Sequence, residues 1–124
     1  MKKIGVKRGT LENIALAAQH AFPMEFIALI GSRSRDNIVD EIVVVPAVFG
    51  SEHAMLYSSL IPFDSGIIGS VHSHPSEYNF PSKADLDSFR KLGKVHLIIS
   101  RPFALSNIRA FDNSGKMVAI EVVD

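Results

Sequence analysis

Residues 66–92 decide the fold of this chain and read GIIGSVHSHPSEYNFPSKADLDSFRKL. The apolar residues within 66–72 predict a strand, and residues 73–81 predict a loop. Residues 82–92 then predict a helix that follows a proline and ends before Gly93, a residue type favoured just past helix ends. The stretch is therefore a strand, a loop and a helix, with polar side chains at the two junctions.

Two histidines and a carboxylate stand at these junctions. His72 and His74 are two residues apart at the end of the predicted strand. Alternate residues of a strand share a face, so both imidazoles can converge on one ion while Ser73 faces away. Asp85 falls in the first turn of the predicted helix, and two imidazoles with one carboxylate are the ligands of an open, catalytic zinc site. Two surface histidines, or two satisfied core histidines, are the alternative.

Ser82 and Asp85 also have the spacing of a capping box. On that interpretation Ser82 caps the helix, and Asp85 suits the positive end of its dipole. The two interpretations are compatible, because a helix start anchored by Pro81 and Ser82 is a rigid mount for a ligand carboxylate.

A zinc hydrolase also needs a general base, and Glu25 is the candidate. It stands at the start of a predicted apolar strand, residues 25–30. A carboxylate in apolar surroundings is costly unless it is paired or functional. An exposed glutamate at a strand end is the alternative.

The remaining pattern predicts an α/β protein built around a mixed sheet. Apolar residues at spacings of three and four predict a first helix over residues 10–22, with Thr10 as its N-cap and Pro23 beyond its end. Further strands are predicted over residues 40–49, interrupted by Pro46, and over 55–60 and 95–100. A hairpin is predicted to join residues 107–111 to residues 116–123. We expect residues 1–124 to form a single domain.

Composition narrows the classes of partner and cofactor. Lysine plus arginine and aspartate plus glutamate number 13 each, so we expect no nucleic-acid partner. Because no apolar run approaches the ~20 residues that cross a bilayer, we expect no membrane partner and a cytoplasmic location. The chain has no cysteine, so a metal site must use nitrogen and oxygen ligands.

Together, these residues resemble the pattern of the JAMM/MPN+ zinc metalloprotease family. That pattern is a glutamate, a long gap, His-Ser/Thr-His-Pro, and then a serine and an aspartate at fixed spacing; every position is filled here, by Glu25, His72 to Pro75, Ser82 and Asp85. The resemblance implies the JAMM/MPN fold, which is cytidine-deaminase-like, with a mixed, curved β-sheet flanked by two main helices. It further implies a compact, stand-alone prokaryotic member of archaeal type.

The resemblance also implies the roles of the site residues. Glu25 would be the general base, Ser82 would stabilise the oxyanion, and Ser73 would support the geometry behind the ligands. The cofactor would be one zinc ion, and its ligands would be His72, His74 and Asp85.

The implied substrate is a ubiquitin-like or sulfur-carrier modifier protein, cleaved at the amide bond after its Gly-Gly tail. The tail would add as a strand beside residues 50–60. No substrate-binding residue is assigned: Tyr78, Phe80 and Met55 are candidates for tail contact, with ordinary packing as the favoured interpretation. A non-catalytic scaffold of the same fold and a zinc amidase acting on small amides are the alternative functions.

The other three histidines are predicted to have no part in the site. His20 ends the first predicted helix, where a histidine suits the negative end of the dipole. His53 lies in a polar stretch and is predicted to be solvated. His96 opens a strand and is predicted to be a hydrogen-bonded structural residue.

Overall fold

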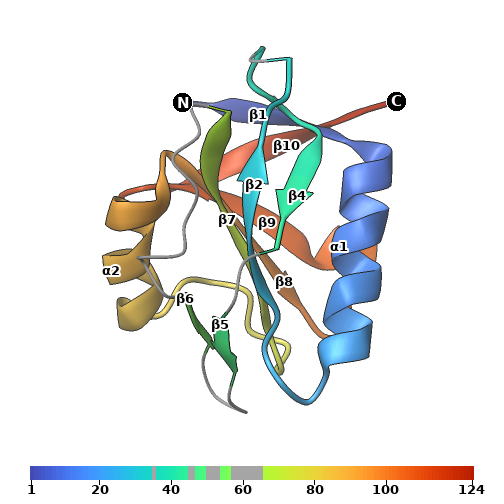
Figure 1. Cartoon of the computed structure of the whole chain (residues 1–124), viewed down its shortest axis with the longest axis vertical. Helices are drawn as coiled ribbons and strands as arrows, with labels where there is room; N and C mark the ends of the chain where they lie inside the picture. The colour runs from blue at the N-terminus through green and yellow to red at the C-terminus, as the bar shows by residue number, and fades with distance from the viewer. Residues whose placement is uncertain (35, 45–46, 50–53, 57–65) are drawn as a thin grey trace.

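The computed structural model describes residues 1–34, 36–44, 47–49, 54–56 and 66–124 (Figure 1). Within them the helices are α1 (Arg8–Ala21), α2 (Lys83–Leu92) and the short 3-10 helix η2 (Leu105–Asn107). The strands are β1 (Lys3–Lys7), β2 (Ile27–Gly31), β3 (Ile38–Val39), β4 (Glu41–Val43), β5 (Ala47–Phe49), β6 (Ala54–Leu56), β7 (Ile67–His74), β8 (Val95–Ser100), β9 (Ile108–Asp112) and β10 (Met117–Val123).

Eight of these strands form one mixed sheet in the order β3-β1-β10-β9-β8-β7-β2-β4, and β5 pairs with β6 separately. The central strand pair β7 and β8 is parallel, with His72 opposite Ile98 and His74 opposite Ser100. β2 runs antiparallel to β7 on its other side. β7, which carries both histidines, is therefore an interior strand held along both edges.

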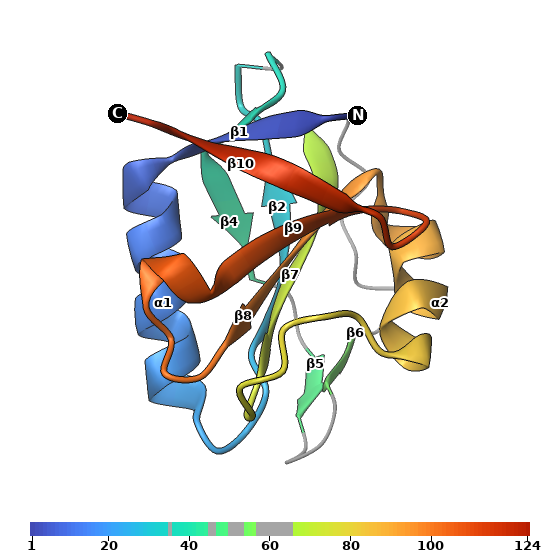
Figure 2. The same ribbon diagram turned by 180° about the vertical axis from the view of Figure 1, so that it is seen from behind.

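The two main helices cover opposite faces of this sheet, as Figures 1 and 2 show from the two sides. Residues of α1 pack with Val71, Leu97 and Ile99 in the larger apolar core. The smaller core on the other face joins Phe89 of α2 to Ile98. Because successive side chains of a strand alternate between faces, the even-numbered residues of β8, and those of β7 from Ser70 onward, face α2. The expected mixed sheet flanked by two helices is confirmed.

The first helix begins earlier than predicted. α1 starts at Arg8 with Lys7 at the N-cap, and Lys7 makes no side-chain capping bond. The prediction of Thr10 as the cap is wrong: Thr10 lies inside the helix and is buried. Its position on the apolar stripe with Leu11 and Ile14 places it against the core. The helix is thus held by packing rather than by a side-chain cap.

Strand β1 was not predicted, although Lys3–Lys7 alternates exposed and buried positions. β1 pairs in parallel with β10, from Lys3 opposite Ala119 to Lys7 opposite Val123. In Figure 2 the two strands cross the same end of the molecule together, with the chain termini at their ends. The only sequence signal for β1 was the spacing of the apolar residues Ile4 and Val6. The partner strand, β10, lies more than a hundred residues away in the chain.

Predicted strand bounds needed correction around the middle of the chain. The single strand predicted over residues 40–49 is two strands, β4 and β5, which belong to different sheets. Pro46 lies outside the described residues. Of the predicted strand over residues 55–60, only residues 55 and 56 are described, and they belong to β6. The predicted strand 95–100 and the terminal hairpin are confirmed as β8, β9 and β10.

No helix in the described parts of the chain has both the length and the apolar character needed to cross a bilayer.

A glycine in β7 provides a test of the close β7–β8 pairing. A Cβ atom placed on Gly69 would overlap the backbone carbonyl of Val95. We expect Gly69→Ala to lower the free energy of unfolding by at least about 3 kcal/mol, because backbone cannot move aside as a flexible side chain can. Urea unfolding checks this. Gly9→Ala is the control, because a Cβ at Gly9 meets nothing within 4 Å, and equal midpoints for the two variants would contradict the prediction.

Candidate metal centre

The two histidines of the motif lie at the end of β7, within regular strand. β7 extends to His74, two residues beyond the predicted strand end. His72 and His74 therefore project from the same face, toward α2, as the spacing predicted. Their rings lie 4.9 Å apart between centroids. The strand that carries both rings is held between β2 and β8.

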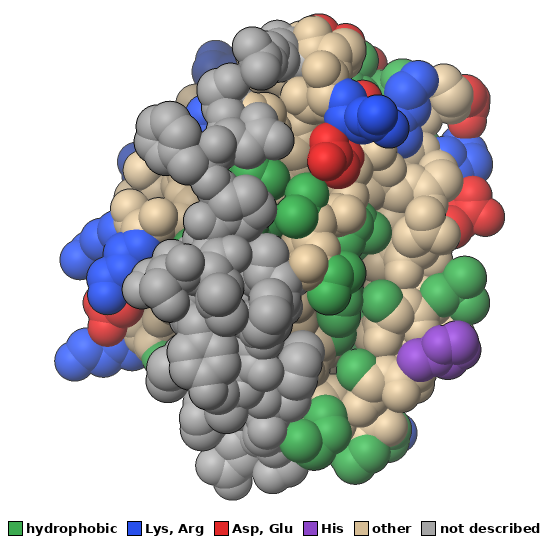
Figure 3. Space-filling model, in the orientation of Figure 1, with side chains coloured by type: hydrophobic (Ala, Val, Ile, Leu, Met, Phe, Trp, Pro, Cys, Tyr) green, Lys and Arg blue, Asp and Glu red, His purple; other side chains and the backbone are tan. Residues whose placement is uncertain are grey.

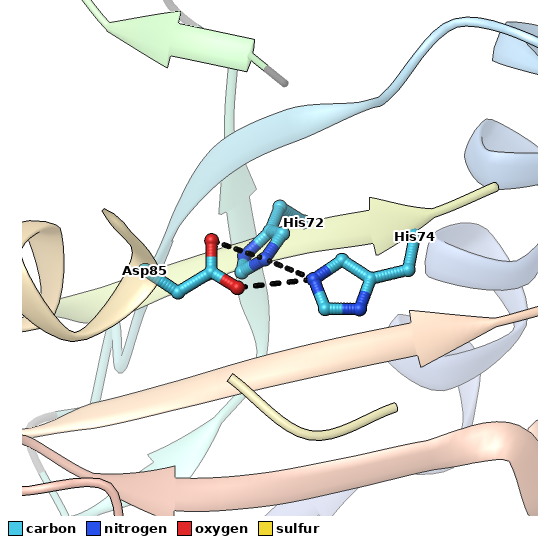
Figure 4. Close-up of side chains that lie close together, drawn as sticks. All are labelled: His72, His74 and Asp85. Carbon is cyan, nitrogen blue, oxygen red and sulfur yellow. Dashed lines mark hydrogen bonds and ion pairs between the residues drawn. The ribbon is translucent and has the colours of Figure 1, made fainter. Parts of the chain in front are cut away.

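The side chains of His72, His74 and Asp85 point toward one another (Figure 4). The Nε2 atoms of the two imidazoles are 3.1 Å apart. The Asp85 carboxylate places Oδ1 3.1 Å from Nε2 of His72 and Oδ2 3.0 Å from Nε2 of His74. Two atoms bound tetrahedrally at roughly 2.0–2.1 Å are about 3.3 Å apart, so the three donors are spaced to fit one zinc ion.

Helix α2 supplies the carboxylate from a capping box. The Ser82 hydroxyl accepts a hydrogen bond from the backbone N–H of Asp85 at 3.1 Å. In return, Oδ2 of Asp85 accepts from the backbone N–H of Ser82 at 2.8 Å. The capping interpretation of both residues is confirmed. The same bonds hold the carboxylate facing the histidines, so the cap also orients it.

The electrostatics of the centre favour an ionised Asp85. Burial opposes the charge of this carboxyl, but hydrogen bonds from His72 and His74 outweigh burial and hold its pKa well below the usual range. The backbone N–H of Ser82 acts in the same direction. Asp85 is thus in the form that a metal ligand requires.

Tyr78 fixes the orientation of the second histidine through its backbone. The carbonyl oxygen of Tyr78 lies 2.8 Å from Nδ1 of His74 and accepts its hydrogen. This bond directs Nε2, the other ring nitrogen, toward the centre. Burial lowers the pKa of His74, but the Asp85 carboxylate and then this carbonyl outweigh burial, so the pKa of His74 is raised. Sequence alone gave no sign of this contact, because it joins a side chain to a backbone atom.

Behind His72 lie two buried rings that the motif does not include. The ring of Phe89, from α2, lies 6.4 Å from that of His72. The ring of His96, on β8, stacks on that of Phe89, with centroids 4.1 Å apart and ring planes 3° from parallel. His96 is held by the Ser70 hydroxyl, 2.7 Å from Nδ1, and the Gly93 carbonyl, 3.0 Å from Nε2. The prediction of a hydrogen-bonded structural histidine is confirmed.

Burial lowers the pKa of His96 to about 4, and this predicts a dependence of stability on pH. The unfolded chain takes up a proton near pH 6.5, before the folded protein does. The contribution of His96 to the free energy of unfolding is therefore fully present above about pH 6.5. It is lost as the pH falls toward 4, by up to about 3 kcal/mol. Urea unfolding of the metal-free protein at pH 7 and pH 5 measures it.

Two variants isolate this effect from that of other titrating groups. His96→Gln removes the buried imidazole and should reduce the loss of stability between pH 7 and pH 5. His20→Gln removes an exposed histidine at the end of α1 and should retain the wild-type loss. The same pH dependence in all three proteins would show that His96 does not cause it.

Glu25 lies beside the centre, but not where the sequence placed it. β2 begins at Ile27, so Glu25 precedes the strand rather than opening it. The residue is buried, with 5% of its surface exposed, which rules out the alternative of an exposed glutamate. Its charge is the smallest of the influences that raise the pKa of His74, after those of Asp85 and the Tyr78 carbonyl.

Ser73 ties the backbone next to Glu25 to the strand that carries the histidines. Its hydroxyl accepts from the backbone N–H of Phe26 at 2.7 Å. Its own backbone N–H donates to the carbonyl of Phe26 at 2.8 Å. Ser73 is fully buried on the face opposite to the two imidazoles. One serine therefore sets the distance between the segment of Glu25 and the two histidines.

The candidates for tail contact are only partly described. Tyr78 and Phe80 are 62% and 41% exposed, and their rings lie 5.8 Å apart between centroids. Both interpretations, packing and tail contact, therefore stay open for them. Met55 lies in β6, of which the structure describes only the backbone. His53 and the rest of the segment 50–60, where the tail was expected to add, lie outside the described residues.

Comparisons with known proteins find a family model and a relative that match most of this chain. The family model of the prokaryotic homologs of the JAB domain matches residues 7–114. A "Probable metalloprotease" of Haloferax volcanii is 31% identical over 98% of this chain and 80% of its own length.

Solved structures match over nearly the whole chain. One, described as "JAMM: A Metalloprotease-like Zinc Site in the Proteasome and Signalosome", has a TM-score of 0.78 and 31% identity, and the match covers 99% of this chain and 100% of that one. A JAB1/MPN domain protein from Archaeoglobus fulgidus has a TM-score of 0.75 and 30% identity, with 98% and 97% covered. A protein from Desulfitobacterium hafniense, at 19% identity and a TM-score of 0.62 over 98% and 93%, shares the fold.

Proposed function

This chain belongs to the JAMM/MPN+ zinc metalloproteases, among the prokaryotic homologs of the JAB domain, and from that premise we propose that it hydrolyses the amide bond after the Gly-Gly tail of a ubiquitin-like or sulfur-carrier modifier protein. The observation that carries the proposal is the convergence of His72, His74 and Asp85 beside a buried glutamate. The two imidazole Nε2 atoms are 3.1 Å apart, and each lies 3.0–3.1 Å from a different oxygen of the Asp85 carboxylate. Three protein ligands leave one tetrahedral position open, as in catalytic rather than structural zinc sites.

His72, His74 and Asp85 would hold the zinc ion. When bound, zinc lowers the pKa of a water in the open position toward about 7 and polarises a carbonyl oxygen. The chain contributes orientation: the Tyr78 carbonyl fixes His74, and the capping box fixes Asp85. These contacts hold both side chains in place, so little conformational entropy is lost when the ion binds.

Glu25 is assigned the role of general base. It would accept a proton from the attacking water and return it to the nitrogen of the leaving amine, which breaks the carbon–nitrogen bond. Its burial supports this assignment, because a buried carboxylate is costly unless it is paired or functional. The two hydrogen bonds between Ser73 and Phe26 hold the backbone next to it.

Ser82 is assigned to the oxyanion. Its hydroxyl oxygen accepts from the Asp85 N–H, and a serine that accepts in this way still has its own hydrogen to donate. That hydrogen would stabilise the negative oxygen of the tetrahedral intermediate, where one donor contributes about 2.7–4 kcal/mol.

The single-domain organisation and the cytoplasmic location stay predictions.

A cleavage assay tests the proposed substrate. The zinc-loaded protein is incubated with a ubiquitin-like protein fused through its Gly-Gly tail to a reporter, by a peptide bond in one substrate and a lysine isopeptide bond in another. Short acyl amides form a third arm. Cleavage after Gly-Gly that a chelator abolishes and zinc restores supports the proposal.

Two results would overturn it. Turnover of the acyl amides with both fusions intact would indicate an amidase. No turnover of any substrate by zinc-loaded protein would indicate a scaffold.

A further inference from the structure

The loop between His74 and α2 presents an aromatic side chain that the proposed mechanism does not use. Tyr78 is 62% exposed although its backbone carbonyl is bonded to His74. An exposed aromatic ring on a segment that is fixed to a ligand suggests a binding role, because tyrosine is among the residues that contribute most at interfaces.

The ring of Tyr78 rests on a rigid support. Its centroid lies 5.8 Å from that of Phe80, which in turn lies 6.0 Å from the ring of Phe111. The guanidinium of Arg109 lies 5.7 Å from the Phe80 ring. Arg109 also donates from Nε to the Asn79 side chain at 3.0 Å. We call the pair Tyr78 and Phe80 the aromatic ridge.

The loop backbone is fixed as firmly as the ridge. The backbone N–H of Arg101, after β8, donates to the carbonyl of Ser76 at 2.9 Å. The Ser76 hydroxyl accepts from the backbone N–H of Tyr78 at 3.3 Å. A surface that is already ordered loses little conformational entropy when a partner binds. The ridge therefore suits recognition better than a mobile loop would.

Other exposed apolar side chains near the site have a packing explanation. Figure 3 shows hydrophobic side chains at the lower end of one face, where Figure 1 draws the turn between α1 and β2. Phe22 of this turn is 40% exposed, and its ring contacts Phe103 and the guanidinium of Arg101. Tyr78, at 62%, is more exposed than Phe22.

We propose that the Tyr78 ring is a specificity determinant that binds an apolar side chain of the substrate close to the scissile bond. The Tyr78 ring lies one side-chain length from the backbone of Tyr78 itself, whose carbonyl oxygen accepts the hydrogen bond from His74. Because extended chain advances about 3.3 Å per residue, the matching substrate residue lies about two or three positions from the cleaved bond. This inference rests on the proposed function, since it assumes that the three donors mark the reaction centre.

Peptides of ten residues with a central Gly-Gly pair, cleaved after its second glycine, provide the probe. One carries Phe at the third position before the cleaved bond, one carries Phe at the third position after it, and the reference has Gly at both. For each peptide, kcat/KM and the calorimetric Kd are measured with the zinc-loaded protein, so that binding is determined even without turnover. The variants are Tyr78→Ala, Tyr78→Phe and, as the control, Leu16→Ala, which removes an exposed leucine of α1.

Tyr78→Ala should raise the peptide Kd and lower kcat/KM about tenfold for one of the two Phe peptides. For the Gly peptide both values should change less than about twofold. Tyr78→Phe and Leu16→Ala should both retain wild-type values. The zinc Kd should not change in Tyr78→Ala, because alanine keeps the backbone carbonyl that binds His74. A purely structural role of Tyr78 would instead change zinc affinity and weaken all three peptides equally.

The outcomes separate this inference from the function on which it rests. Equal binding of the peptides by wild type and Tyr78→Ala, or an equal loss for all three, overturns the inference while cleavage by wild type leaves the proposed function intact. Binding that depends on both Tyr78 and Phe, together with intact Gly-Gly fusions in the cleavage assay, supports the recognition site and contradicts the proposed function.

Discussion

Glu25→Gln is expected to lower kcat by about 10²–10⁴-fold and to leave the zinc affinity unchanged. The expected range is the usual contribution of a general base. Glutamine has the same shape as glutamate but cannot accept the proton of the attacking water. Because Glu25 is buried, a smaller side chain would leave a cavity, and glutamine is therefore the variant that changes charge without changing packing.

Three measurements check this prediction: zinc content, kcat on the Gly-Gly fusion, and the urea midpoint. Glu77→Gln is the matched control, because Glu77 is an exposed carboxylate on the loop that follows His74. Its activity should equal that of wild type. Full activity of Glu25→Gln would move the base to another residue, whereas a loss of zinc would make Glu25 part of the metal centre itself.

Asp85→Ala is expected to weaken zinc binding by more than about 100-fold. Residues that only support a ligand already contribute about 10–100-fold, and Asp85 would provide the donor atom itself. One oxygen of its carboxylate lies 3.1 Å from His72 and the other 3.0 Å from His74. Activity should fall in proportion to zinc occupancy. The same substitution also removes half of the capping box and should lower the stability of the metal-free protein by about 1 kcal/mol.

Two variants separate the ligand from the cap. Ser82→Ala removes the capping hydroxyl but keeps the Asp85 carboxylate, so zinc affinity should change much less than in Asp85→Ala. Asp87→Ala removes an exposed carboxylate from the same helix and should change neither. Isothermal titration with zinc, together with urea unfolding of the metal-free proteins, provides both readouts. Equal zinc affinity of Asp85→Ala and wild type would show that Asp85 is not a ligand.

Local rules account for the parts of the site that the sequence predicted. The period of a strand places His72 and His74 on one face, and the three-residue spacing of a capping box joins Ser82 to Asp85. Both rules act over a few residues, within one element. For the same reason the bounds of β8, β10 and α2 were predicted closely, because each is a short apolar or amphipathic run with a turn or cap at its end.

Contacts between distant segments account for what was missed. Thr10 looked like a cap because its side chain suits one, but packing against the sheet buries it inside α1. β1 pairs with β10 across the length of the chain, and such pairing depends on the whole sheet rather than on the five residues of β1. The Tyr78 carbonyl that orients His74 could not be predicted from residue types, since every residue has one.

The residue order specifies which side chains can bind a metal and which two elements carry them, because spacing along a strand and at a helix start is set by backbone geometry alone. Whether these two elements meet depends on packing across the whole chain. It brought Asp85 from α2 to within 3.1 Å of β7, and it joined Ser73 to Phe26 and so placed Glu25 beside the centre. Those contacts span 13 and 47 residues of chain, and their loop-closure entropy is offset by the burial of two cores on opposite faces of one sheet.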